Sequence, residues 1–139
     1  MPKTSLQLLG SVGLFEGLSQ KELTQVHRQA REGEFSAGDV IVTEGETGVG
    51  FHLILSGRAK VLAGKRTIAT LGPGDFFGEL SLIDRGPRTA TVVANTTLKT
   101  LSLVSWEFLP MLDRNPSIAR KLLIAITGRL RNERKSHTH

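Results

Sequence analysis

Residues 76–91 read FGELSLIDRGPRTATV and differ in character from the chain on either side. Gly78 can adopt a φ angle that other residues avoid, and the apolar spacing in ELSLID predicts a short helix directly after it. The first backbone N–H groups of such a helix lack intrahelical partners and attract anions. Ser81 keeps the side chain small at this point, so an oxygen of a ligand can approach closely. The stretch therefore predicts an anion site.

Glu79 and Arg88 add opposite charges to this stretch. Pro87 biases Gly86 towards extended geometry, so the turn DRGP is expected to return Arg88 to the anion site as the next strand begins. A guanidinium binds phosphate through two charge-assisted hydrogen bonds. Glu79 would repel the same anion, so its natural partner is a hydroxyl such as that of a ribose. The two residues predict a nucleotide, the alternative being that they pair with each other as a surface salt bridge.

Short segments separated by glycine surround this stretch. Their Val, Ile, Thr and Leu content and their length of roughly four to eight residues predict strands joined by tight turns. About eight antiparallel strands with no helices between them predict a mainly β fold with flanking helices, namely an eight-stranded antiparallel jelly roll (double-stranded β-helix). The segments are DVIVTEG (39–45), GFHLILSG (50–57), RAKVLAG (58–64), RTIATLGPG (66–74), RTATVVAN (88–95) and TLKTLSLV (97–104).

The two ends of the chain carry helix signals. Ser19 and Glu22 form a capping box ahead of apolar residues at helical spacing. Ser105 is expected to cap a second helix, in which Pro110 should cause a break or a kink.

A longer helix is predicted to begin at Pro116, with Asn115 as its N-cap, and to end at about Arg131. Its apolar residues at helical spacing predict one broad apolar face. That face comprises Ile118, Leu122, Leu123, Ile126 and Leu130.

Length and composition predict a single domain over residues 1–139. We divide it into an N-terminal helical part (1–33), a jelly roll (34–104) that contains 76–91, C-terminal helices (105–134) and a tail (135–139). Most of the net charge of +5 lies in residues 128–139, where four basic residues accompany one acidic residue. We expect this tail to be solvated more often than bound.

The absence of cysteine excludes a disulfide framework and a thiolate zinc site. The apolar stretch LQLLGSVGLF (6–15) is interrupted by glycine and followed by Glu16, so we expect no signal peptide and no membrane span. We therefore predict a cytoplasmic protein that does not bind a membrane.

An enzyme built on a jelly roll would need several histidines around a metal. Among His27, His52, His137 and His139 only His52 falls on a central strand, so we predict no catalytic residues, no metal site and no cofactor.

Residues FGELSL and PRTAT resemble the phosphate-binding cassette of the cyclic-nucleotide-binding domain family, which includes catabolite-activator-like proteins and kinase regulatory subunits. The spacing between the acid and the arginine is that of the family. The resemblance extends to IVTEGETGVGFHLILSGRAKV, to LGPGDFFGE and to NPSIARKLL, and covers roughly residues 14–134. It implies that the ligand is cAMP or cGMP.

The resemblance also implies roles for individual residues. Glu79 would accept a hydrogen bond from the ribose 2′-OH, and Arg88 would bind the exocyclic phosphate oxygens. Thr89, which follows the arginine, bears on the choice between cGMP and cAMP, and we prefer cAMP. The remaining implied residues are the backbone N–H groups around Gly78, Leu80 and Ala90, an apolar wall of Val42, Val61 and Leu71, and Arg129, Glu133 and Arg134 on the final helix, which would cover the base.

These observations predict a stand-alone cyclic nucleotide sensor that has no output domain of its own and signals by moving its C-terminal helix. A second copy or a protein partner is expected to bind this helix. A transcription regulator of the catabolite-activator type would carry a helix-turn-helix domain after it, but only about eight residues follow Arg131, so we expect no direct DNA binding. Two alternatives stay open: such a regulator without its DNA-binding domain, and a jelly roll with a degenerate pocket that acts in protein–protein interaction.

Overall fold

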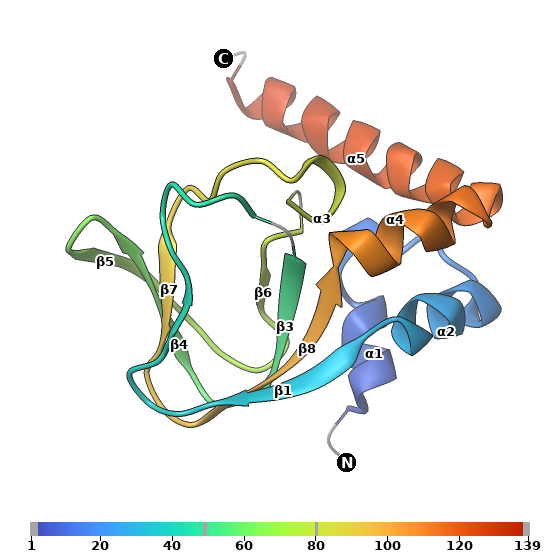
Figure 1. Ribbon diagram of the computed structural model, residues 1–139. Helices are drawn as coiled ribbons and strands as arrows, with labels where there is room; N and C mark the ends of the chain where they lie inside the picture. Colours follow the sequence, from blue (N-terminus) through green and yellow to red (C-terminus); the bar gives the residue numbers. More distant parts are fainter. Residues whose placement is uncertain (1–2, 49, 80, 138–139) are drawn as a thin grey trace.

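The computed structural model describes residues 3–48, 50–79 and 81–137, with side chains described as far as residue 132. Two four-stranded antiparallel sheets within these ranges form the jelly roll (Figure 1). The order of strands in the first sheet is β1 (Arg31–Phe35), β8 (Leu98–Val104), β3 (Gly50–Ser56) and β6 (Phe76–Phe77). The order in the second sheet is β2 (Val40–Val42), β7 (Thr91–Ala94), β4 (Ala59–Ala63) and β5 (Arg66–Leu71). The predicted fold class is confirmed.

Helices from both ends of the chain cover one side of the first sheet, as Figure 1 shows. The N-terminal elements are α1 (Ser5–Gly10), the 3₁₀ turn η1 (Gly13–Phe15) and α2 (Gln20–Arg28). The C-terminal helices are α4 (Ser105–Asp113) and α5 (Pro116–His137), and the one-turn helix α3 (Ser81–Asp84) lies between β6 and β7. Strand β1 begins at Arg31, which shortens the N-terminal helical part predicted to reach residue 33.

The core has two parts because successive side chains of β3 point to opposite faces of the sheet. Phe51 and Leu53 pack against the helices, together with Phe15 and Phe108. Ile54 packs between the two sheets. Apolar side chains therefore fill both faces of the first sheet, as a sheet covered by helices on one face and by a second sheet on the other requires.

The predicted helix signals have mixed outcomes. Ser19 and Glu22 form the capping box that begins α2. The N-cap of α4 is Val104 rather than Ser105, whose hydroxyl instead donates to the Ser81 carbonyl oxygen. Helix α4 continues through Pro110, and the expected break is absent from it. Phe108 and Met111 on either side of the proline are buried, so packing outweighs the lost backbone hydrogen bond.

Helix α5 begins at Pro116 as predicted but extends to His137, beyond the expected end at Arg131. Only part of its predicted apolar face is buried. Ile118 and Leu122 are buried in the core, whereas Leu123 and Leu130 are 65% and 56% exposed. The core contacts only one side of this helix, so the predicted face is divided between the interior and the surface.

Candidate functional site

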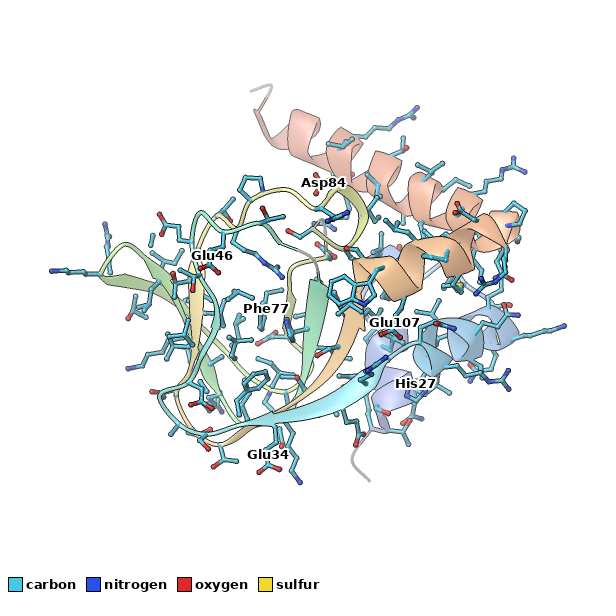
Figure 2. All side chains as sticks on the ribbon, in the orientation of Figure 1. His27, Glu34, Glu46, Phe77, Asp84 and Glu107 are labelled. Atoms are coloured by element: carbon cyan, nitrogen blue, oxygen red, sulfur yellow. The ribbon has the colours of Figure 1, made fainter. Side chains whose placement is uncertain are left out.

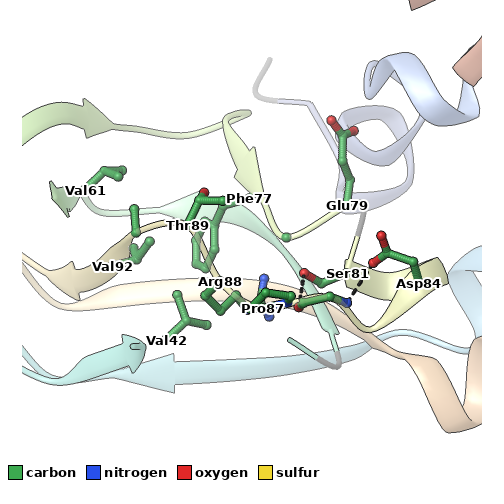
Figure 3. Close-up of a pocket in the computed structure, with 13 residues that line it drawn as sticks. Val42, Val61, Phe77, Glu79, Ser81, Asp84, Pro87, Arg88, Thr89 and Val92 are labelled. Atoms are coloured by element: carbon green, nitrogen blue, oxygen red, sulfur yellow. Dashed lines mark hydrogen bonds between the residues drawn. The ribbon is translucent and has the colours of Figure 1, made fainter. Parts of the chain in front are cut away.

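A cavity of about 560 Å³ opens between the second sheet and the segment that contains α3 (Figure 3). One side of the cavity is apolar and the opposite side carries the charged residues of 76–91. The lining residues are Val42, Val61, Phe77, Gly78, Glu79, Ser81, Asp84, Gly86, Pro87, Arg88, Thr89, Ala90 and Val92. The fold thus leaves a hollow at the stretch where the sequence predicts a ligand.

Arg88 is held at both its backbone and its side chain. Its backbone N–H donates to the Glu46 carbonyl oxygen at 2.8 Å, and its own carbonyl oxygen accepts from the Gly45 N–H at 2.9 Å. The Nη2 atom donates to the Gly50 carbonyl oxygen at 2.6 Å. The side chain is half-buried, and burial lowers the pKa of the guanidinium. A fixed and partly dehydrated cation of this kind is suited to binding an anion such as phosphate.

Two glycines leave the space that this guanidinium occupies. Gly78 has a φ of +81°, and a Cβ atom there would overlap Nη1 of Arg88 and the Gly50 carbonyl oxygen. A Cβ atom on Gly48 would overlap the Ser81 hydroxyl and lie 2.9 Å from Nε of Arg88. The backbone can therefore approach the Arg88 side chain at Gly48 and Gly78 because neither residue has a side chain.

A network of short-range hydrogen bonds shapes the turn between α3 and Arg88. The Ser81 hydroxyl donates to the Gly86 carbonyl oxygen at 3.3 Å, and the Gly86 N–H donates to Asp84 Oδ1 at 2.8 Å (Figure 3). Thr47 and Pro87 form an isolated antiparallel bridge. These contacts return the chain from α3 to β7, as the DRGP turn predicts.

Glu79 does not pair with Arg88 in this structure. Its Oε1 atom forms an ion pair with Nη1 of Arg129 on α5 at 2.5 Å. In Figure 3 the Glu79 side chain points away from Arg88. The alternative in which the acid and the arginine of 76–91 form one surface salt bridge is therefore wrong, since each has a different partner.

The structure brings most of the predicted residues to the cavity. Gly78, Glu79, Ser81, Arg88, Thr89, Ala90, Val42 and Val61 line it. Leu71 is not among the lining residues and packs against the core between the sheets. Arg129 reaches the site through its ion pair with Glu79. Leu80 and the side chains of Glu133 and Arg134 lie outside the part of the chain that is described.

Several lining residues were missed from the sequence, including Phe77, Asp84 and Val92. Strand alternation was the available signal for two of them. Phe76 packs against the helix side of the core, so Phe77 points between the sheets (Figure 2). Val92 faces inward on β7 for the same reason. Asp84 carried no such signal, because its position depends on where α3 ends.

No three His, Asp or Glu side chains gather in a way that could hold a metal ion within residues 3–48, 50–79 and 81–132. None of the helices in the described ranges has the length and apolar character that a bilayer-spanning helix needs.

The jelly roll and its cavity, which holds a fixed arginine, define the class of a small-molecule binding module. Residues 32–115 match the family model described as cyclic nucleotide-binding domain. The match covers more than half of the 139 residues, so the chain belongs to the cyclic nucleotide-binding domain family.

The similar proteins include regulators and channels. The chain is 30% identical over 132 residues to the CRP-like cAMP-activated global transcriptional regulator of Mycobacterium tuberculosis, with 90% of this chain and 58% of that protein covered. It is 39% identical over 113 residues to a cyclic nucleotide-gated potassium channel of Mesorhizobium japonicum, with 81% and 31% covered. The chain therefore spans between about a third and three fifths of these relatives.

A crystal structure described as the N-terminal domain of a transcriptional regulator from Streptomyces coelicolor has a similar fold. It superposes with a TM-score of 0.87 at 31% sequence identity and covers 95% of this chain and 96% of that chain. The described relatives are regulators or channels rather than enzymes.

Proposed function

We propose that the cavity binds a cyclic nucleotide monophosphate, with cAMP preferred and cGMP also accepted. Arg88 carries this proposal, because its guanidinium is fixed in the cavity by a 2.6 Å hydrogen bond to Gly50 and by the absence of a Cβ atom on Gly78. The exocyclic phosphate oxygens would bind this cation, and backbone N–H groups around Gly78, Leu80 and Ala90 would complete the phosphate site.

The rest of the ligand follows from the lining of the cavity. Glu79 would accept a hydrogen bond from the ribose 2′-OH, and Thr89 would lie near the base. Val42, Val61 and Phe77 offer an apolar wall on the opposite side. Burial of the flat faces of the base against this wall adds affinity but does not distinguish adenine from guanine. This supports binding of either cyclic nucleotide.

The same arrangement supports a regulatory role without catalysis. Helix α5 contacts the site through Arg129, so a ligand that changes the surroundings of Glu79 changes the position of this helix. We propose that the chain senses the nucleotide and signals through the movement of α5, on which Glu133 and Arg134 would help to cover the base. This output involves a second copy or a protein partner rather than DNA or a membrane, and it would take place in the cytoplasm.

A second candidate is that the chain is the sensory part of a transcription regulator. The likeness to the N-terminal domain of a transcriptional regulator over 95% of the chain favours it. Nucleotide binding is common to both candidates. A degenerate pocket is less well supported, because the cavity has a volume of about 560 Å³ and keeps its arginine.

The Arg88→Leu variant tests the phosphate contact. We expect it to lose roughly 2–5 kcal/mol of cAMP binding, about 30-fold or more, because the phosphate would be buried without its cation. Titration calorimetry measures the loss. The matched control is Arg66→Leu on β5, where an exposed arginine is removed from a strand that does not line the cavity.

The ligand class is tested by melting temperatures in the presence of cAMP, cGMP, linear AMP and cyclic dinucleotides. A ligand at 100 times its dissociation constant stabilises the native state by about 2.7 kcal/mol. We expect cAMP to raise the melting temperature most and linear AMP least. Equal melting temperatures for all four additions and the free protein would contradict the proposed function.

A further inference from the structure

The two carboxylate oxygens of Glu79 have different surroundings. Oε1 is paired with Nη1 of Arg129, whereas Oε2 is buried and has no hydrogen-bond partner among the described residues. The Glu79 side chain is 11% exposed and that of Arg129 is 42% exposed. A nearly buried acid in the wall of the cavity is thus neutralised by one cation that comes from the C-terminal helix.

Neither oxygen is available to a ligand in this arrangement. Oε1 is occupied by Arg129, and Oε2 is shielded from solvent and therefore from anything in the cavity. The side chain also points away from Arg88, where the phosphate would lie (Figure 3). A hydroxyl next to that phosphate can meet the carboxylate only after the side chain turns towards the cavity, away from the position in which Oε1 now pairs with Arg129.

We propose that Arg129 competes with the ligand hydroxyl for Glu79, and is therefore a specificity-determining residue of the site. The proposal rests on the nucleotide-binding function proposed above and concerns its regulation. A ligand with a 2′-hydroxyl replaces Arg129 at the carboxylate and breaks the ion pair that holds α5, so that the helix is free to move over the bound ligand. A ligand without this hydroxyl leaves the ion pair and the helix in place.

The solvent exposure of Arg129 determines how strongly it competes with the ligand hydroxyl for Glu79. An ion pair with one partner in contact with solvent is screened and contributes little, so a hydroxyl can replace it. Removal of Arg129 is expected to strengthen the contribution of the 2′-hydroxyl to affinity by about two- to fivefold, the range that corresponds to a weak exposed pair.

The test compares Arg129→Met with the parent protein, using cAMP and 2′-deoxy-cAMP as probes in calorimetry. Methionine keeps an unbranched side chain and removes the charge and the donors. Loss of a positive charge acts on both ligands alike, so the informative quantity is the ratio of their affinities. We expect cAMP to gain about two- to fivefold relative to 2′-deoxy-cAMP. The matched control is Arg131→Met, an exposed arginine two residues further along α5 that changes the net charge equally.

Three results would overturn the proposal: an unchanged ratio, a ratio that falls, or an equal change in Arg131→Met. A falling ratio would mean that Arg129 holds Glu79 ready for the ligand rather than competing with it.

A second measurement needs no ligand and separates this proposal from the proposed function. Amide hydrogen exchange over residues 120–132 is compared in the parent, Arg129→Met, Glu79→Gln and the double variant. We expect faster exchange in each single variant and no further increase in the double variant, because both remove the same contact. If no nucleotide binds the parent protein, the proposed function is wrong. If the effects of the two single variants on exchange add up in the double variant, the ion pair does not hold α5, whatever the result for nucleotide binding.

Discussion

His52 lies on β3 just behind the wall of the cavity. Its ring stacks on that of Phe77, with the centroids 5.0 Å apart, and its Nδ1 atom shares a hydrogen bond of 3.0 Å with the Ser102 hydroxyl. Burial, with a smaller contribution from the charge of Arg88, lowers the pKa of His52 from 6.5 to about 4. The neutral ring therefore supports an apolar wall next to a cation without adding a second charge.

This shift makes stability depend on pH. The folded pKa of His52 is below the unfolded value, so the unfolded chain binds an extra proton between these two values. The stabilisation is fully present above about pH 6.5 and is lost as the pH falls towards 4. We expect the free energy of unfolding to decrease by up to about 3 kcal/mol across this window.

Urea unfolding at several pH values, in the parent protein and in His52→Leu, measures this effect. Leucine has no proton to gain, so the variant should lose most of the slope between pH 6.5 and 4. The same slope in both proteins would assign the effect to other groups.

At the scale of elements, Glu22 connects two helices that are remote in sequence. Its carboxylate caps α2 by accepting from the Ser19 backbone N–H at 2.9 Å, and it also accepts from Lys121 and Ser117 on α5 at 2.5 and 2.8 Å. The Lys121 contact, followed by those with Ser19 and Ser117, lowers the pKa of Glu22 from 4.5 to about 2. The first half of α5 is thus attached to α2, while its second half carries Arg129 to the cavity.

We expect Glu22→Gln to loosen the first turns of α5, because glutamine cannot pair with the Lys121 charge. Faster amide exchange over residues 116–122 would report this change. The folded pKa of Glu22 is depressed, so the contact is present above about pH 4.5 and is lost as the pH falls towards 2. The control is Glu34→Gln, since Glu34 is exposed on β1, away from α5 (Figure 2). Equal exchange in both variants would contradict the expectation.

At the scale of the whole molecule, the helices and the jelly roll form two sides of one core, and α5 runs along the outside of the helical side (Figure 1). The outward face of α5 exposes Leu123 and Ile124 at 65% and 61%. Adjacent exposed leucine and isoleucine side chains on a helix are unfavourable in water and typical of a contact surface. They support the proposal that a second copy or a protein partner binds this face.

A Leu123→Glu, Ile124→Glu double variant tests whether the partner is a second copy. If the helix mediates self-association, sedimentation velocity should show a dimer for the parent protein and a monomer for the variant, because buried like charges would oppose the contact. The core residues Ile118 and Leu122 are unchanged, so the fold should be retained. A monomeric parent protein at all accessible concentrations would exclude the second copy and leave a different protein as the partner.

The sequence predicted those structural features that depend on interactions between residues close together along the chain. The length and the Val, Ile, Thr and Leu content of short segments predicted β7 and β8, the capping box predicted α2, and Asn115 with Pro116 predicted the start of α5. The site at 76–91 was predicted for the same reason, since a glycine, a turn and the spacing of two charges lie within one short segment. Pro110 does not break α4, because packing of Phe108 and Met111 outweighs the lost backbone hydrogen bond.

The amino-acid sequence by itself determined the jelly roll and indicated that Glu79 and Arg88 belong to one segment, which lines the cavity. Only the tertiary structure decided which partner each of them has: Gly50 for Arg88 and Arg129 for Glu79. Glu79 and Arg129 are far apart along the chain, and a long-range ion pair has no local signal. It depends on how α5 packs against the rest of the molecule, and that is decided by the burial of Ile118 and Leu122 in a core shared by both ends of the chain.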